Sequence, residues 1–244
     1  MPEYVYAIVE SSAPTPDRPG IAGRPLRAIR TPDAAALVSS IDAEELTLGR
    51  AELLAHNEVL QAALETGPVL PMRLGTVMAD DDDIRRRILD SNAAELHAQL
   101  TRLAGTFEGE VRAVYDEAAL LREAVQRDPH IARLRARGDL RRSRNGYLES
   151  VTLGEAVADA VERIRQSDAD MLLAELTPHC LEVRVSPPVH ERIALRAAFL
   201  LDRDHSSEFD DALESVARSQ AGRIHFRYTA PLAPHSFVAL GGAA

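Results

Sequence analysis

The feature that most constrains the fold is a series of alternating segments in the second half of the chain. Four segments alternate apolar and polar residues with the period of two that is typical of strands with one buried face. Two segments with helical periodicity separate them. The four strand segments are TFEGEVRAVYD (106–116), HCLEVRVS (179–186), RIALRAAFLLD (192–202) and RIHFRYTA (223–230). The order strand–helix–strand–strand–helix–strand predicts a ferredoxin-like domain.

Alternation also predicts which side chains of these strands face the core. The outward set is charged, so it can pair charges but has no aromatic rings on which RNA bases stack, as an RNA-recognition sheet requires. The residues expected inside are Phe107, Val111, Tyr115, Leu181, Val183, Val185, Ile193, Leu195, Phe199, Leu201, Ile224, Phe226 and Tyr228, and those expected outside are Glu108, Glu110, Arg112, Glu182, Arg184, His225 and Arg227.

The two intervening helices have their own signals. The longer one carries an apolar stripe, and the shorter one is expected to begin with a capping box of Ser207 and Asp210 and to end at Gly222. An arginine-rich insertion, at about residues 127–146, precedes the longer helix. It is predicted to be a solvated connector or short helix, with binding to an acidic surface or a nucleic-acid backbone as the alternative. The stripe consists of Val157, Val161, Ile164 and Met171.

The first half of the chain predicts a mixed α+β sheet domain. Short β-branched and aromatic runs indicate strands at Tyr4–Val9, Leu26–Arg30 and Ala36–Ile41. A helix is expected from Asp42, with Leu53, Leu60 and Leu64 on its apolar stripe and Gly67 and Pro68 ending it.

A strand is then expected over GPVLPMRLGTV (67–77), with Leu70, Met72 and Leu74 on one face. Pro71 has no N–H for a sheet ladder, so this strand is predicted near a sheet edge. The following run of four aspartates, Asp80–Asp83, is expected to cap a helix. The alternating pattern of a calcium loop is missing.

These signals predict an α+β protein of two domains. The first, residues 1–104, is a mixed α+β sheet domain, and the second, residues 105–244, is a modified ferredoxin-like domain (βαββαβ) with the arginine-rich insertion and an extended C-terminal tail. The chain has 244 residues, which is long enough for both cores.

Composition excludes several classes of protein. The net charge is −10, which disfavours non-specific binding of nucleic acid, and every basic residue other than histidine is arginine. A single cysteine, Cys180, rules out an internal disulfide and a cysteine-based zinc site. The N-terminus lacks the pattern of a signal peptide, and no segment has the roughly 20 apolar residues of a membrane span. We therefore expect no membrane contact and a cytoplasmic location.

The chain carries no catalytic signature. Zinc-protease histidine pairs, a nucleophile elbow, a Walker A loop and a dinucleotide fingerprint are all missing. We expect no enzyme activity, no cofactor and no metal. Arg73 is open to two interpretations, as a clamp for a carboxylate or phosphate or as one partner of an ion pair on the less buried sheet face. His56 is expected to be a hydrogen-bonded, partly buried histidine.

Five segments, taken in order, resemble the gas vesicle GvpL/GvpF family, and together they span nearly the whole chain. The most specific are HNEVL…PVLPMRLGT and the ending PLAPHSFV. This ending departs from the family's usual pattern, t-G-P-w-P-P-Y-s-F, at Ala230, Leu232, Pro234 and His235. The five segments are YVYAIV, AHNEVLQAALETGPVLPMRLGTV, LAGTFEGEVRAVYD, GYLE and FRYTAPLAPHSFV.

The resemblance implies an accessory protein of gas vesicle formation that is not an enzyme. It implies association with the small hydrophobic shell protein GvpA and with other accessory Gvp proteins, contact with GvpA through the N-terminal domain, and location at the gas vesicle. We expect Pro71, Arg73, His56 and Asn57 to contribute to protein binding, through the surface or the edge of the N-terminal sheet. The alternatives are a minor structural component of the vesicle wall and a ferredoxin-like ligand-binding or regulatory protein.

Overall fold

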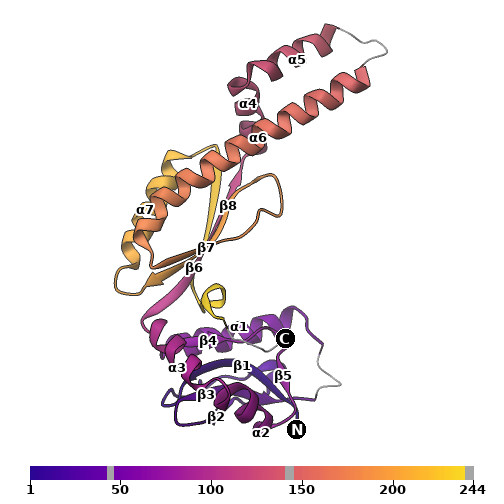
Figure 1. Ribbon diagram of the computed structural model, residues 1–244. Coiled ribbons are helices and arrows are strands. Elements are labelled where there is room, and N and C mark those ends of the chain that lie inside the picture. The colour runs from indigo at the N-terminus through magenta and orange to yellow at the C-terminus, as the bar shows by residue number, and fades with distance from the viewer. Residues whose placement is uncertain (43–46, 141–145, 240–244) are drawn as a thin grey trace. The chain divides into compact units, whose positions relative to one another are not determined.

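The computed structural model describes residues 1–42, 47–140 and 146–239, which form two antiparallel sheets with flanking helices (Figure 1). The predicted α+β class is confirmed. The chain divides into two compact units. The first contains residues 1–109, 202–204 and the segment from residue 230 onward, and the second contains residues 110–201 and 205–229. The C-terminal segment thus belongs to the first compact unit, whereas its place in the sequence predicted a tail of the second domain.

The sheet of the first unit is built around its first strand. Seven of the eight residues of β1 are buried, because strands pair with it on both sides and helices pack against it. The sheet order is β2-β3-β1-β4, and β5 also pairs with β1. Strand β4, which contains Pro71, is at the end of this order, so the predicted edge position of the proline is confirmed. The strands are β1 (Glu3–Glu10), β2 (Arg27–Arg30), β3 (Ala34–Ser40), β4 (Val69–Pro71) and β5 (Val77–Met78).

The helices of this unit differ in detail from the prediction. Helix α1 begins at Arg50, not at Asp42, and the predicted helical residues 43–46 lie outside the described residues. Leu53 is 43% exposed and does not belong to the buried stripe, which Leu60 and Leu64 do join. The helices are η1 (Ile21–Gly23), α1 (Arg50–Leu64), α2 (Asp81–Ile84), the π-helical η2 (Arg85–Asp90) and α3 (Ala93–Arg102).

The aspartate run caps a helix as predicted. The side chain of Asp80 accepts a hydrogen bond from the Asp83 N–H at 2.8 Å, and the next three aspartates fill the first turn of α2. Negative charge is favourable there, since it opposes the positive end of the helix dipole.

The predicted single strand at residues 67–77 is two short strands with a turn between them. Leu70 and Met72 are buried, but Leu74 lies in the turn and is 37% exposed. The turn forms because the Thr76 N–H donates to the Arg73 carbonyl at 3.1 Å and Gly75 adopts a φ of +90°. Alternation alone did not reveal this turn.

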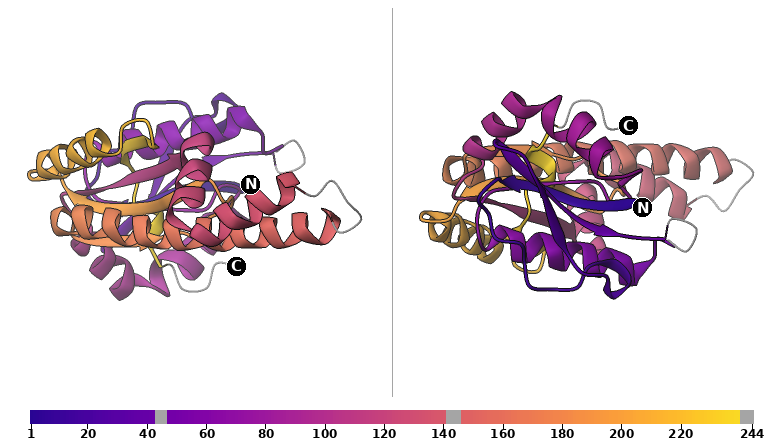
Figure 2. Two further views of the ribbon diagram at one scale, coloured as in Figure 1. Left: turned by 90° about the horizontal axis from the view of Figure 1, so that it is seen from above. Right: turned by 90° about the horizontal axis from the view of Figure 1, so that it is seen from below.

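The sheet of the second unit has the order β7-β8-β6-β9, so the first strand in sequence lies between the third and the fourth. Helices α6 and α7 contact the face that carries Tyr115 and Tyr228. Helix α6 extends past the sheet and runs beside α5 (Figures 1 and 2). The elements are β6 (Thr106–Tyr115), α4 (Glu117–Arg127), α5 (Pro129–Leu140), α6 (Gly146–Leu176), η3 (Thr177–His179), β7 (Glu182–Val185), β8 (Ile193–Asp202), α7 (Ser206–Ser219), β9 (Ile224–Leu232) and η4 (His235–Phe237).

A charged network joins these elements. The Arg223 guanidinium donates to Asp168 at 2.6 Å and to Glu123 at 2.6 and 3.0 Å, and Tyr115 donates its hydroxyl to Asp168 at 2.5 Å. Asp168 is 6% exposed, and these partners replace the water that burial removes from its carboxylate. The network ties α4 and α6 to the end of the sheet.

Three predictions for this half need correction. Leu181 and Val185 are exposed because β7 is a short edge strand. Helix α7 begins at Ser206, which places Ser207 inside the helix and leaves the expected capping box unformed. Glu108 is 6% exposed and does not lie on an open face. The arginine-rich insertion was predicted to be a connector or short helix, and residues 129–140 of it are helical, while residues 141–145 lie outside the described residues.

Candidate partner-binding site

A pocket of about 220 Å³ in the first unit lies beside the predicted binding residues. One wall is the end of β4 and the turn that follows it, with Pro71 and Arg73. The other wall is the C-terminal segment around His235. The lining residues are Pro71, Met72, Arg73, Thr76, His235, Val238 and Ala239.

The turn that carries Arg73 is held at both ends. The Met72 N–H donates to the Tyr6 carbonyl, and the Val5 N–H donates to the Thr76 carbonyl, each at 2.9 Å. Within the turn, the Thr76 hydroxyl donates to the Arg73 carbonyl at 2.8 Å. These bonds anchor the Arg73 backbone to the central strand β1 of the sheet.

A buried group of Tyr4, Tyr6 and His56 supports the turn from behind. The Gly75 N–H donates to the Tyr4 hydroxyl at 3.0 Å, and that hydroxyl lies 3.0 Å from His56 Nδ1. Which of the two groups donates depends on the His56 tautomer, since the hydroxyl can either donate to Nδ1 or accept from it. Burial, with a smaller contribution from nearby His235, lowers the pKa of His56 to about 4, so its ring is neutral near pH 7.

Two buried polar side chains hold the C-terminal wall. The Glu108 carboxylate accepts hydrogen bonds from the N–H and the hydroxyl of Ser236, both at 2.8 Å. The Gln99 amide pairs with both backbone groups of Ala239, donating to its carbonyl at 2.8 Å and accepting from its N–H at 3.2 Å. Glu108 and Gln99 are 6% and 5% exposed, so the wall is held by polar groups that are almost completely buried.

The charge of the pocket favours an anion. Arg73 is exposed, and among the described residues it has no ion-pair or hydrogen-bond partner for its guanidinium. The positive charge comes from Arg73. Although His235 is an exposed residue, desolvation of its ring lowers its pKa below the usual value, so the ring is neutral near pH 7 and offers a hydrogen bond without charge. Among the described residues, no carboxylate lines the pocket. Since guanidinium groups match the planar geometry of carboxylates, this arrangement fits an acidic side chain of a partner better than an internal ion pair.

The structure brings two of the four predicted binding residues to this pocket. Pro71 and Arg73 line it. His56 is 1% exposed and lies behind the turn, where the expected hydrogen-bonded histidine is confirmed but has no surface for a partner. Asn57 is exposed on α1 and is not among the lining residues.

Sequence reasoning missed the opposite wall, which is formed by His235, Val238 and Ala239. It also missed Gln99 and Glu108, which hold that wall. The one signal in the sequence was the ending PLAPHSFV. Because this ending follows the last strand segment of the second domain, the sequence did not indicate that it packs with the first unit.

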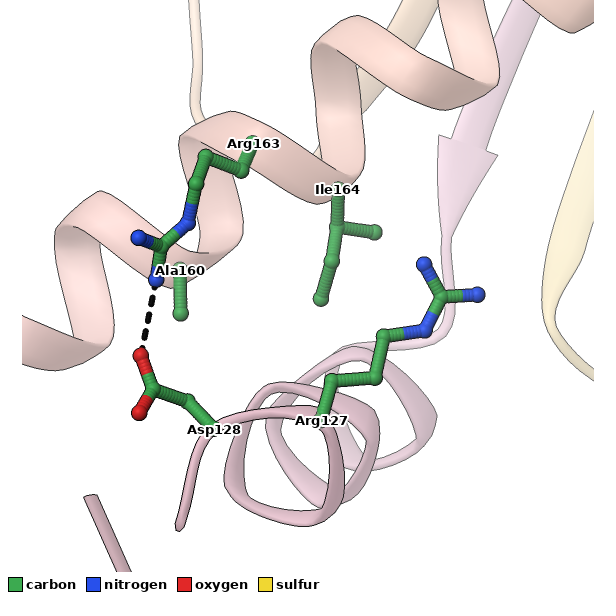
Figure 3. Close-up of a pocket in the computed structure, with 5 residues that line it drawn as sticks. All are labelled: Arg127, Asp128, Ala160, Arg163 and Ile164. Carbon is green, nitrogen blue, oxygen red and sulfur yellow. Dashed lines mark hydrogen bonds and ion pairs between the residues drawn. The ribbon is translucent and has the colours of Figure 1, made fainter. Parts of the chain in front are cut away.

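A second hollow, in the second unit, is a weaker candidate. It lies where α4 meets α5, against α6, and is lined by Arg127, Asp128, Ala160, Arg163 and Ile164 (Figure 3). Asp128 and Arg163 face each other in the hollow at 2.8 Å, and Arg127 pairs with Glu123 at 2.7 Å. Both arginines are therefore already neutralised by acidic neighbours.

Comparison with known proteins places the whole chain in one family. Residues 3–239 match the family described as "Gas vesicle synthesis protein GvpL/GvpF". The chain belongs to the GvpL/GvpF family. It is 33% identical over 244 residues to gas vesicle protein F of Streptomyces sp. (strain CB03234), with 98% of this chain and 100% of that protein covered. It is 32% identical to gas vesicle protein L of the same strain, with 98% and 93% covered.

Two solved structures in the GvpL/GvpF family have the same fold. GvpF from Anabaena sp. PCC7120 superposes with a TM-score of 0.86 at 23% identity, covering 99% of each chain. GvpF from Microcystis aeruginosa gives 0.79 at 23% identity, covering 97% of this chain and 98% of that one. The predicted family is thus confirmed, together with a role in gas vesicle formation.

Within the described ranges, no helix is long and apolar enough to cross a membrane. The same residues hold no group of three or more histidine, cysteine, aspartate or glutamate side chains arranged to bind a metal ion.

Proposed function

We propose that this protein is a non-catalytic assembly factor that binds the small hydrophobic shell protein GvpA, and other accessory Gvp proteins, during gas vesicle formation. The observation that carries the proposal is the exposed, unpaired guanidinium of Arg73 on a turn anchored to β1. A carboxylate of the shell protein would bind the Arg73 guanidinium there, with the neutral ring of His235 on the opposite wall.

The properties of the shell protein explain why a binding protein is needed. A subunit whose apolar surface and strand edges later form a gas-tight wall aggregates if it is released uncovered. A protein that covers this surface until a growing vesicle accepts the subunit prevents the aggregation. Edge strand β4 lies next to the pocket, and Pro71 removes one N–H from it, which limits indiscriminate strand pairing.

We also infer a division of labour between two domains, of which only the shell-protein contact of the first is implied by the family resemblance. The first would contact the shell protein. The second would be ferredoxin-like, which the strand order β7-β8-β6-β9 supports, and would contact other accessory proteins. We place the protein at the gas vesicle and in the cytoplasm during assembly.

Genetic complementation tests this function. In a host that makes gas vesicles and lacks its own copy of this gene, the wild-type chain is expected to restore vesicles seen by electron microscopy. Arg73→Glu is expected to restore few, because the substitution repels the acidic group of the partner. Full restoration by Arg73→Glu would contradict the proposed site. Mass spectrometry of washed vesicles addresses the alternative, since a minor wall component stays with the vesicles and an assembly factor is removed.

A further inference from the structure

The second unit has a surface that the proposed shell-protein site does not use. Its sheet packs one face against α6 and α7, and the opposite face carries Arg112 on β6 and His225 and Arg227 on β9. All three side chains are exposed. We call this group the β6/β9 cationic patch.

The two arginines of the patch are cross-strand neighbours. The Asp116 N–H donates to the Arg223 carbonyl at 2.9 Å where β6 ends and β9 begins. Continued along the antiparallel pair, this register sets Arg112 opposite Arg227. Cβ atoms of such a pair lie about 5 Å apart, and like charges in this position are destabilising.

Two other arginines on this face form ion pairs, but Arg112 and Arg227 do not. Arg196 pairs with Glu110 at 2.9 Å, and Arg184 pairs with Glu182. Among the described residues, neither Arg112 nor Arg227 has an ion-pair or hydrogen-bond partner for its side chain. In a chain with ten more acidic than basic residues, two adjacent unpaired arginines are a cost that folding alone does not explain.

We propose that the β6/β9 cationic patch binds an acidic helix of another protein, and that it is a second interface, distinct from the Arg73 pocket. Glutamates at positions i and i+4 of a helix have Cβ atoms about 6 Å apart. This distance is close to the roughly 5 Å between the Cβ atoms of two cross-strand arginines. Val114, half-buried beside the arginines on the same face, offers the helix a small apolar contact.

A second copy of this chain fits the patch less well than a different protein does. The densest acidic run of the chain, Asp80–Asp83, is already engaged within its own unit. These carboxylates cap a helix or pair with arginines: Asp80 with the Asp83 N–H, Asp81 with Arg27, Asp82 with Arg85 and Asp83 with Arg87.

Peptide binding to the full-length protein tests this proposal. The probe is a fluorescently labelled amphipathic helical peptide with glutamates at i and i+4, compared with the same peptide carrying glutamines. Fluorescence anisotropy at low salt is expected to show binding of the glutamate peptide. We expect Arg112→Glu with Arg227→Glu to weaken it at least tenfold. The matched control, Arg122→Glu with Arg218→Glu, makes the same charge change on helices α4 and α7 and is expected to leave it within twofold.

Two results would overturn the proposal. One is equal binding of the glutamate and glutamine peptides, and the other is equal loss of binding in the patch and control variants, which would indicate a general charge effect. The single variant Arg112→Glu gives a further check. It creates an ion pair with Arg227, so we expect an unchanged or higher Tm together with weaker peptide binding. A clearly lower Tm would mean that the two arginines serve the fold.

Discussion

The hydroxyl of Tyr4 lies 3.0 Å from Nδ1 of His56, and both side chains are almost completely buried. The same hydroxyl accepts the Gly75 N–H at 3.0 Å. Strand β1, helix α1 and the Arg73 turn therefore meet at one oxygen atom. The position of the exposed arginine therefore depends on a hydroxyl group that no partner can reach.

Tyr4→Phe removes the shared oxygen. It leaves the Gly75 N–H and His56 Nδ1 without their partner, which costs about 1–3 kcal/mol in the free energy of unfolding. We expect faster hydrogen exchange of the Gly75 amide, measured by NMR. Tyr228→Phe in the second unit is the control, and it is expected to leave that amide unchanged. Equal protection of Gly75 in Tyr4→Phe and wild type would contradict this role.

The neutral state of His56 predicts a pH dependence of stability. In the unfolded chain this residue takes up a proton near pH 6.5, whereas in the folded chain its pKa is about 4. Between these values the unfolded state binds more protons, so stability falls as the pH falls from about 6.5 to about 4. The loss reaches about 3 kcal/mol. We expect His56→Gln, which does not titrate, to lack this part of the slope in urea unfolding at several pH values. A slope equal to that of wild type would show that His56 does not cause it.

Gly75→Ala tests the geometry of the turn. Gly75 has a φ of +90°, and a Cβ there would lie 2.7 Å from Leu48 Cδ1. We expect a loss of about 1–2 kcal/mol in the free energy of unfolding and weaker partner binding. Gly67→Ala is the matched control, because nothing lies within 4 Å of its added Cβ and its φ is not positive. Equal stability of the two variants would contradict the assigned turn geometry.

Glu108→Leu tests the C-terminal wall of the pocket. It removes the acceptor for the N–H and the hydroxyl of Ser236, and hydrogen bonds to a charged group contribute about 1.5–3 kcal/mol each. We expect increased hydrogen–deuterium exchange, by mass spectrometry, in the segment around residues 235–239. Glu110→Leu, whose carboxylate pairs with exposed Arg196, is the control and is expected to have no effect on that segment. Unchanged exchange in Glu108→Leu would mean that other contacts hold the wall.

Local patterns in the sequence predicted the class of fold and most strands, because strand alternation and the Asp80 cap depend on neighbouring residues. The edge position of Pro71 followed from its missing N–H. Long-range contacts were not predictable in this way. Alternation placed Glu108 on an open face, but a segment more than 120 residues later buries it. The pairing of Gln99 with Ala239 is also a long-range contact. Since neither contact was predictable from local patterns, one wall of the pocket was missed.

The most direct test of the account is the amount of GvpA that co-purifies with this protein when both are expressed together. We predict that Arg73→Glu retains less than a tenth of the GvpA bound by the wild-type chain. Arg24→Glu, which changes another exposed arginine of the same unit, is predicted to retain nearly all of it. Retention of GvpA by Arg73→Glu at the wild-type level would contradict the proposed site.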